Sequence, residues 1–132
     1  RGPLGHSDGD VVCHALADAL FGATGLGDIG QHFPNTDPQW KDVAGLDLLS
    51  RSVAILAAGG WRPASADVTV VLERPKLVPH LPAIRQRVAD VLGLDVSAVS
   101  VKGKTNEGVD AVGRGEAIAA HAVATVVRVT GA

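Results

Sequence analysis

The sequence predicts an α+β domain in which helices cover one face of a mixed β-sheet, and two observations support this fold class. Three segments repeat apolar residues at helical spacing, and three shorter ones are rich in β-branched residues, in the order α, α, β, α, β, β. The 132 residues are 46% hydrophobic and 20% charged, which suffices for one packed core but not for two. We therefore expect one domain over residues 1–132.

The first helix is expected over residues 8–24. Ser7 followed three residues later by Asp10 resembles a capping box, and two acids in the first turn suit the positive end of the helix dipole. Apolar residues then recur every three or four positions until Gly25, which is a typical terminator. Cys13, in the middle of this helix, is interpreted as a buried thiol rather than a nucleophile.

Two further helices are expected over residues 42–58 and 79–92, each with an apolar stripe along one face. Gly59 and Gly93 end them. The preceding segment, 25–41, is rich in glycine, proline and turn-forming residues, so it is expected to be a loop.

Three segments are expected to be strands. Residues 66–72 are β-branched and partly alternate, and residues 99–102 alternate valine with polar residues. The segment 116–129 is ambiguous, because its alanines permit a helix while its end is β-branched; we favour a strand. A glycine-rich loop over 103–115 precedes it.

Composition excludes several functions. The net charge of -2 provides no positive surface for nucleic acid or an anionic membrane, and no apolar run approaches the roughly 20 residues that span a bilayer. The single cysteine cannot form an internal disulfide, which fits a reducing compartment such as the bacterial cytoplasm. The chain begins with neither methionine nor a signal-peptide pattern, so we expect its true beginning to lie upstream.

Asp10, His14 and Asp18 are spaced four residues apart and form one stripe along the first helix. Imidazole and carboxylate groups together suit zinc, manganese or iron, with the carboxylates binding the metal or orienting the histidine. The alternative is an ordinary solvated polar face. One helix supplies too few ligands for a closed site, so the spacing alone leaves both interpretations open.

Polar residues outside this stripe suggest phosphate or nucleotide binding. His6 and Ser7 precede the expected helix, where free N–H groups favour phosphate, although Ser7 could be only a cap. Residues 25–30 match GxGxxG but follow a helix instead of a strand, so we reject a dinucleotide fold; Asp28 could still hold a ribose diol.

Two polar loops after strands offer further candidates. Lys76 could meet a phosphate, and residues 102–108 combine cations, a hydroxyl and a carboxylate, as a magnesium–phosphate site requires. The alternative to phosphate binding is that these lysines contact only water. For Arg114 and Glu116 the alternative is an ordinary surface ion pair.

Six motifs together resemble 2-C-methyl-D-erythritol 2,4-cyclodiphosphate synthases over essentially the whole chain. They are His6-Ser7-Asp8-Gly9-Asp10 with His14, Gly27-Asp28-Ile29-Gly30, Phe33-Pro34-Asn35-Thr36-Asp37, Arg74-Pro75-Lys76-Leu77, Thr105-Asn106-Glu107 and Gly113-Arg114-Gly115-Glu116.

The resemblance implies a homotrimer whose active sites lie between neighbouring subunits. In this family the 2-phosphate of 4-diphosphocytidyl-2-C-methyl-D-erythritol 2-phosphate attacks the β-phosphorus, which expels CMP and closes a cyclic diphosphate. The implied cofactors are Zn2+ and a second divalent cation, Mg2+ or Mn2+. They suit phosphoryl transfer, which depends mainly on alignment and charge neutralisation.

The resemblance also implies roles for individual residues. His14 is expected to bind zinc and Glu107 the second cation. Thr105, at the diphosphate, and Asp18, at the erythritol hydroxyls, are the expected catalytic residues. The expected substrate-binding residues are His6, Ser7, Asp28, Gly30, Pro75, Lys76, Leu77, Lys104, Thr105 and Arg114.

The chain departs from the family pattern in three places. The N-terminal Gly-x-Asp-x-His element, which supplies two more zinc ligands, has no counterpart, so we expect the N-terminal segment to be missing. Lys104 and Asn106 replace threonines, and residues 109–112 replace a Leu-Gly-Phe-Thr stretch. Two alternatives therefore stay open: an inactive nucleotide- or phosphate-binding homologue, and the cyclase domain of a bifunctional cytidylyltransferase-cyclase.

Overall fold

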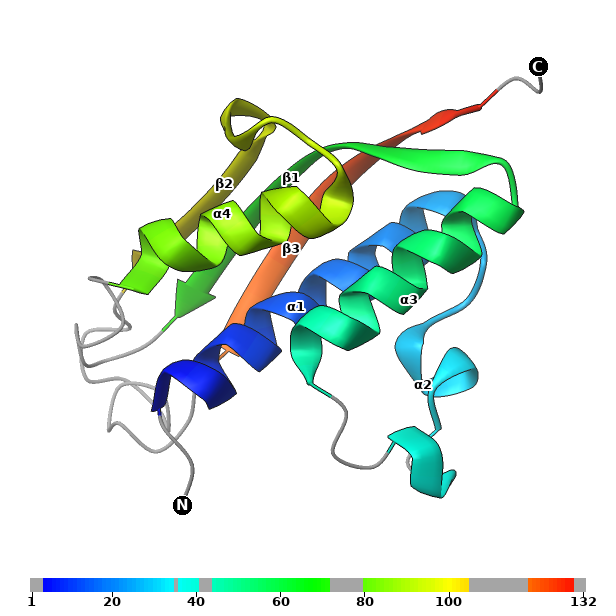
Figure 1. Ribbon diagram of the computed structural model, residues 1–132, viewed down its shortest axis with the longest axis horizontal. Coiled ribbons are helices and arrows are strands. Elements are labelled where there is room, and N and C mark those ends of the chain that lie inside the picture. Colours follow the sequence, from blue (N-terminus) through cyan, green and yellow to red (C-terminus); the bar gives the residue numbers. More distant parts are fainter. Residues whose placement is uncertain (1–3, 35, 41–43, 72–79, 105–118, 130–132) are drawn as a thin grey trace.

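Helices lie on one face of a three-stranded sheet in the computed structural model (Figure 1). The structure describes residues 4–34, 36–40, 44–71, 80–104 and 119–129, with backbone only for 4–8 and 40. The long helices are α1 (Leu4–Thr24), α3 (Gly45–Ala58) and α4 (Leu81–Leu92); the strands are β1 (Trp61–Val71), β2 (Val99–Lys104) and β3 (Ala119–Arg128). Short helical turns are α2 (Ile29–His32), η1 (Pro38–Trp40) and η3 (Val96–Ala98).

The central strand of the sheet is β1, and the strand order is β2-β1-β3. β1 pairs in parallel with β2 and antiparallel with β3. A parallel pair requires a crossover connection, and α4 provides it on the face that α1 and α3 also cover. The predicted α+β class, with a mixed sheet and helices on one face, is confirmed.

Alternation along β1 determines which face the helices cover. Ala66, Val68 and Val70 are buried beneath them, whereas Asp67 lies on the opposite face and is exposed. The β3 residues paired with these buried positions are small: Ala120, Ala122 and Ala124. Small side chains allow α1 to lie directly against β3.

One side of α1 supplies much of the core. Val12, Leu16, Leu20 and Phe21 are completely buried there. Each such side chain contributes about 1.5–3 kcal/mol through the removal of apolar surface from water. The positions match the apolar spacing that predicted this helix.

The predicted start of α1 is wrong. The helix begins at Leu4, so Ser7 lies inside it and is not its N-cap, and its first turn contains no acid. The placement of His6 and Ser7 before the helix fails for the same reason. A Ser-x-x-acid pattern is also compatible with a helix interior, where short polar side chains bond their own backbone or face solvent.

Several strand and loop boundaries also differ from expectation. β1 begins at Trp61 instead of residue 66, because its pairing with β3 continues past an irregularity near Pro63 to place Trp61 opposite Arg128. The Arg128 guanidinium lies 4.3 Å from the centre of the Trp61 ring. β2 extends to Lys104, and α2 and η1 interrupt the expected loop over 25–41. The favoured strand near the end of the chain is confirmed as β3.

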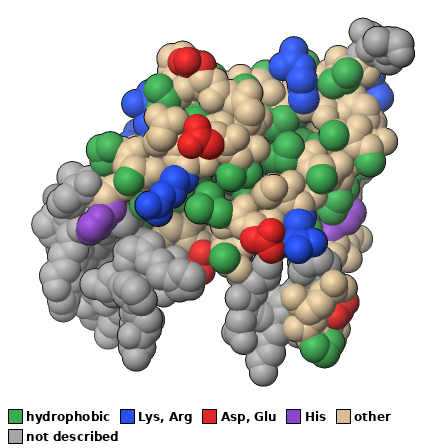
Figure 2. Space-filling view, in the orientation of Figure 1, with side chains coloured by type: hydrophobic (Ala, Val, Ile, Leu, Met, Phe, Trp, Pro, Cys, Tyr) green, Lys and Arg blue, Asp and Glu red, His purple; other side chains and the backbone are tan. Residues whose placement is uncertain are grey.

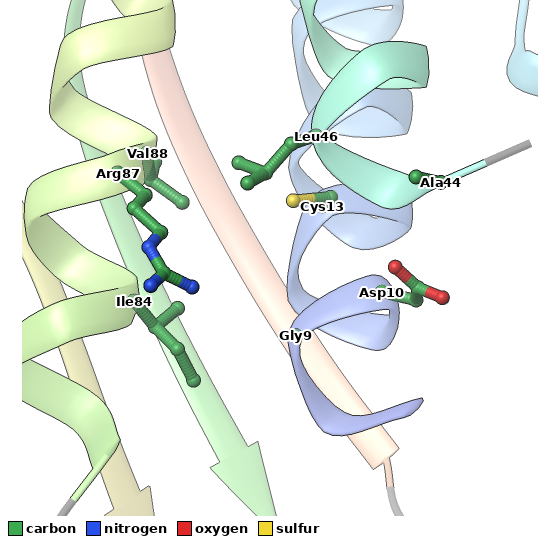
Figure 3. Close-up of a pocket in the computed structure, with 8 residues that line it drawn as sticks. All are labelled: Gly9, Asp10, Cys13, Ala44, Leu46, Ile84, Arg87 and Val88. Carbon is green, nitrogen blue, oxygen red and sulfur yellow. The ribbon is translucent and has the colours of Figure 1, made fainter. Parts of the chain in front are cut away.

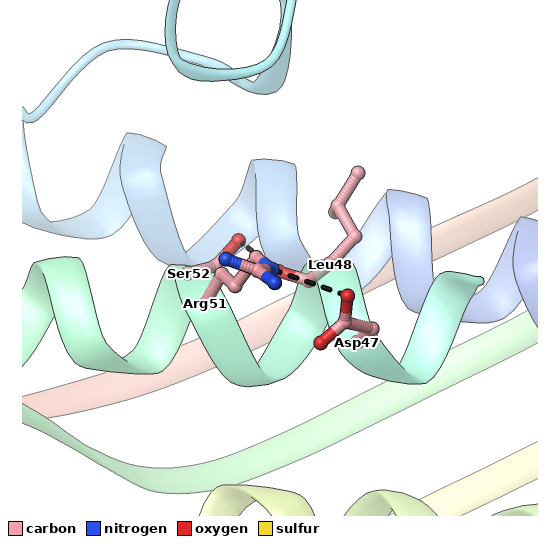
Figure 4. A network of polar contacts seen from close by, with 4 residues as sticks. All are labelled: Asp47, Leu48, Arg51 and Ser52. Carbon is pink, nitrogen blue, oxygen red and sulfur yellow. Dashed lines mark hydrogen bonds and ion pairs between the residues drawn. The ribbon is translucent and has the colours of Figure 1, made fainter. Parts of the chain in front are cut away.

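Polar groups in the middle of α3 find partners within that helix (Figure 4). Ser52 is fully buried, and its hydroxyl donates to the carbonyl oxygen of Leu48 at 2.8 Å. On the exposed side, Arg51 Nε donates to Asp47 Oδ2 at 3.1 Å. Such an exposed pair contributes only about 0.3–0.5 kcal/mol, so we regard this part of α3 as structural.

Acidic and basic side chains are interspersed over the helix side of the molecule (Figure 2). This mixture agrees with the small net charge of -2. Among the described helices, none combines the length and apolar character needed to cross a membrane.

Candidate active site

Asp10, His14 and Asp18 form a polar stripe along α1, and its two carboxylates hold the first residues of two other helices. Asp10 Oδ1 accepts a hydrogen bond from the backbone N–H of Gly45, the first residue of α3, at 2.8 Å. The N-cap residue of α3, Ala44, makes no side-chain capping bond. Asp10 therefore satisfies one of the free N–H groups of α3 from a distant part of the chain.

Asp18 binds α2 in the same way. Its Oδ1 accepts from the backbone N–H of Ile29, the first residue of α2, at 3.1 Å. Both carboxylates therefore do more than form a solvated polar face, since each binds the start of another helix, while the Asp18 side chain is itself exposed. Within the described residues, Asp18 Oδ2 has no hydrogen-bond partner, so this exposed oxygen can still meet a ligand.

His14 lies one helical turn from each carboxylate and has the properties of a metal ligand. Its Nε2 is buried and lacks a hydrogen-bond partner in the described part of the chain. A buried polar atom without a partner is costly, and a bound cation would satisfy it. The described ranges contain no group of three or more His, Cys, Asp or Glu side chains suited to a metal, so further ligands would come from other residues.

The segment that we call the Gly27–Gly30 loop ends in the first two residues of α2 and presents Asp28 as the N-cap of that helix. Asp28 Oδ1 accepts from Gln31 N at 2.8 Å, and Asp28 N donates to Gln31 Oε1 at 3.1 Å, so the two residues form a capping box. Gly27 has φ +104°, and a Cβ built there would lie 2.2 Å from Gln31 Oε1. Only glycine fits this position without strain.

The sheet register brings the ends of two predicted binding loops together. Val71, the last residue of β1, lies opposite both Lys104, the last residue of β2, and Ala119, the first residue of β3. Lys104 is exposed there. The N-terminal ends of α1 and α4 lie at the same end of the molecule (Figure 1). These termini form one group of candidate site residues, whereas α2, which Asp28 precedes, lies on the other side of the molecule (Figure 1), so the single chain does not bring the two groups together.

The structure places only some of the predicted site residues. Asp18, Asp28, Gly30, Lys104 and His14 are described, with Asp18 and Asp28 joined through α2. His6 and Ser7 are placed only as backbone of α1. The remaining candidates lie outside the described residues: Pro75, Lys76, Leu77, Thr105, Glu107 and Arg114.

A cavity of about 140 Å³ lies between α1, α3 and α4 (Figure 3). Its walls are formed by Gly9, Asp10, Cys13, Ala44, Leu46, Ile84, Arg87 and Val88. Burial, and secondarily the charge of Asp10, raises the pKa of the Cys13 thiol to about 12. Cys13 is therefore protonated at neutral pH, which agrees with its interpretation as a buried thiol.

Sequence reasoning missed the capping role of Asp10 and the position of His32. The absence of a capping side chain at Ala44 was an available signal that another residue supplies the cap. No comparable signal pointed to His32, whose Nε2 donates to the carbonyl oxygen of Leu26 at 2.7 Å while its ring stacks on Phe21.

Comparison with known proteins identifies the relatives of this chain. A 2-C-methyl-D-erythritol 2,4-cyclodiphosphate synthase from Symbiobacterium thermophilum is 57% identical over 126 residues, covering 96% of this chain and 80% of that protein. A bifunctional enzyme IspD/IspF from Anaeromyxobacter is 53% identical over 128 residues, covering 97% of this chain but 33% of that protein.

Solved structures share the fold. The bifunctional IspDF from Campylobacter jejuni matches with a TM-score of 0.85 and 35% identity, covering 93% of this chain and 33% of that one. A 2C-methyl-D-erythritol-2,4-cyclodiphosphate synthase in its CDP-bound form matches with a TM-score of 0.81 and 36% identity, covering 96% and 81%. The YgbB family matches residues 1–127. The resemblance seen in the motifs is confirmed, and the chain belongs to the YgbB family.

Proposed function

We propose that this protein is a 2-C-methyl-D-erythritol 2,4-cyclodiphosphate synthase. It converts 4-diphosphocytidyl-2-C-methyl-D-erythritol 2-phosphate to 2-C-methyl-D-erythritol 2,4-cyclodiphosphate and CMP, a step of non-mevalonate isoprenoid synthesis. The observation that carries this proposal is 57% identity to such a synthase over 96% of the chain. A related synthase has been solved with CDP, which supports a cytidine nucleotide as part of the substrate.

The reaction is an internal phosphoryl transfer. An oxygen of the 2-phosphate forms a bond to the β-phosphorus, the bond from this phosphorus to the bridging oxygen breaks, and CMP leaves with the electron pair. No covalent bond to the protein is needed, so the residues act by alignment and by binding charge. Asp28 and Gly30 hold the substrate at the start of α2, and Asp18 Oδ2 binds the erythritol hydroxyls.

Residues beyond the described ranges, together with His6 and Ser7 of α1, complete this proposed site. Thr105 contacts the diphosphate beside Lys104, and Arg114 binds a further anionic group. Pro75, Lys76 and Leu77 form the cytidine pocket, while His6 and Ser7 bind phosphate or the erythritol moiety. The support for this grouping is the register that places the ends of β1, β2 and β3 together.

His14 is the proposed zinc ligand, and Glu107 the proposed ligand of Mg2+ or Mn2+. Support for the first assignment is the buried Nε2 of His14, which lacks a partner among the described residues. When bound, the divalent cations neutralise charge on the phosphate oxygens. We expect His14→Ala to lose most of the zinc that the native protein retains after dialysis.

We also propose a homotrimer located in the bacterial cytoplasm. The support for assembly is the sheet face that no helix of the described residues covers, where Val123 is 68% exposed. Around it lie the Asp67–Lys102 ion pair and a hydrogen bond between the hydroxyls of Ser65 and Thr125. A helix-free face of this mixed polar and apolar character can contact further copies of the chain, and the homotrimer itself is what the family resemblance implies.

The test is CMP release by the full-length protein supplied with zinc and magnesium or manganese. We expect release by the native protein, loss of at least 100-fold (an order-of-magnitude expectation) in His14→Ala, and native activity in Gln86→Ala, on the exposed side of α4. CDP binding without CMP release would instead favour an inactive binding homologue. The bifunctional alternative, which the match to IspD/IspF enzymes favours, is decided by the length of the gene product.

A further inference from the structure

A side-chain hydrogen bond of His32 joins the two ends of the segment that contains Asp28. Its Nε2 and the carbonyl oxygen of Leu26 are 2.7 Å apart. A carbonyl oxygen only accepts hydrogen bonds, so this ring nitrogen carries the proton and donates it. The bond ties the residue before the loop to the last residue of α2.

The imidazole ring is itself held in place. It stacks on Phe21 of α1 with ring centroids 4.4 Å apart and an interplanar angle of 21°. Phe21 is completely buried, so it provides a rigid surface for this stacking. The backbone of Leu26 is also attached to α1, because Leu26 N donates to Phe21 O at 3.0 Å.

The side chains of three residues hold Asp28 and the residues beside it, and His32 N also donates to Asp28 O at 3.3 Å. Asp18 holds Ile29, on the C-terminal side of Asp28, and Gln31 holds the Asp28 carboxylate and amide. His32 holds the Leu26 carbonyl, on the N-terminal side, next to Gly27 with its φ of +104°. Because glycine has the widest backbone freedom, this side of the loop depends most on an external restraint.

We propose that His32 is a positioning residue that orients Asp28 for substrate binding. This inference rests on the proposed function, since it assumes that the Gly27–Gly30 loop holds the substrate. His32 itself touches neither substrate nor metal in this proposal. Removing its donor should widen the range of Asp28 orientations in the free enzyme, weaken substrate binding, and leave the chemical step nearly unchanged.

Two single variants distinguish the contribution of the His32 N–H donor from that of ring stacking on Phe21. His32→Phe retains an aromatic ring against Phe21 but cannot donate to Leu26 O. His32→Gln loses the ring but retains an N–H donor of similar reach. We expect His32→Phe to raise KM by about two- to tenfold, within the range for one lost hydrogen bond, with kcat within about twofold. His32→Gln should restore KM to within about twofold of the native value.

The measurements are KM and kcat for CMP release, CDP affinity by calorimetry, and Tm for each full-length variant. An unchanged KM in His32→Phe would overturn the positioning role, whether or not kcat and Tm fall. Failure of His32→Gln to restore KM would also overturn it, because the donor would then not be the relevant group.

Failure of the proposed function is distinguishable from failure of this inference. If the native protein releases no CMP, the enzymatic assignment fails, and CDP affinity then decides the role of His32. Weaker CDP binding by His32→Phe than by His32→Gln would support positioning, whereas equal affinities, or no CDP binding by the native protein, would overturn it.

Discussion

The carboxylate of Asp10 in α1 and the backbone N–H of Gly45 form a hydrogen bond of 2.8 Å that fixes the start of α3. Because Ala44 provides no cap, we expect Asp10→Ala to lower the free energy of unfolding by about 1–2 kcal/mol in urea denaturation. Asp10→Asn retains an acceptor oxygen and should lose less. Asp90→Ala, an exposed acid of α4, is the control, and equal stability of Asp10→Ala and the native protein would contradict this role.

The surroundings of two helical glycines predict opposite effects of alanine. A Cβ at Gly45 would lie 2.6 Å from Asp10 Oδ1 and 2.8 Å from Asp10 Cα, so Gly45→Ala requires the two helices to separate. At Gly22, in α1, a Cβ would meet no atom of the described residues within 4 Å. We expect Gly45→Ala to destabilise the protein by at least about 1 kcal/mol and Gly22→Ala to stabilise it by about 0.5–1 kcal/mol. Thermal and urea unfolding of the two variants provide the comparison.

Ionisation of Cys13 should make stability fall at alkaline pH. Burial raises the thiol pKa from 9.0 to about 12, so between these values the unfolded chain releases a proton that the folded chain retains. Stability associated with Cys13 is therefore fully present below pH 9 and is lost as pH rises toward 12. We expect the native protein to lose about 2 kcal/mol more than Cys13→Ala between pH 8 and 10.5, measured by urea unfolding under reducing conditions. Identical pH dependence in the two proteins would exclude this effect.

If the trimer forms through the sheet face that carries Val123, a charge at this position should lower the mass of the assembly in solution. Val123→Asp places a charge on a side chain that is 68% exposed in the single chain, and we expect it to shift the trimer toward monomer in light scattering. Val129→Asp is the matched control, because Val129 is also exposed but follows the end of β3. A Val123→Asp protein that keeps the native mass would argue against assembly through this face.

Periodicity was sufficient to predict the three long helices, two of the strands and the α+β class, because apolar spacing reports directly which side chains enter the core. The segment that forms β3 was ambiguous, and α2 and η1 lie where a loop was expected. The burial of Val12, Leu16 and Leu20 follows the spacing in the sequence. Boundaries were less predictable. Ser7 and Asp10 form a pattern that local sequence cannot distinguish from a cap, and the extension of β1 to Trp61 depends on pairing with distant Arg128.

The candidate site was predictable in chemistry but not in geometry. His14 and Asp28 were identified as residue types suited to metal and substrate binding, yet neither their spacing nor their chemistry reveals what their neighbours do. The bond from Ile29 to Asp18 arises only when α2 folds back against α1, and the bond from His32 to Leu26 arises only when the chain turns between these two residues. Tertiary contacts of this kind leave no local pattern in the sequence.

The two roles of α1 restrict how its sequence can drift during evolution. One side carries Leu16 and Phe21 in the core, and another carries Asp10, His14 and Asp18, which hold neighbouring helices or present a buried nitrogen. A neutral change must therefore satisfy packing and site geometry at once along most of this helix. The exposed positions of α4, such as Gln86 and Asp90, carry no such double constraint and can accumulate substitutions more freely.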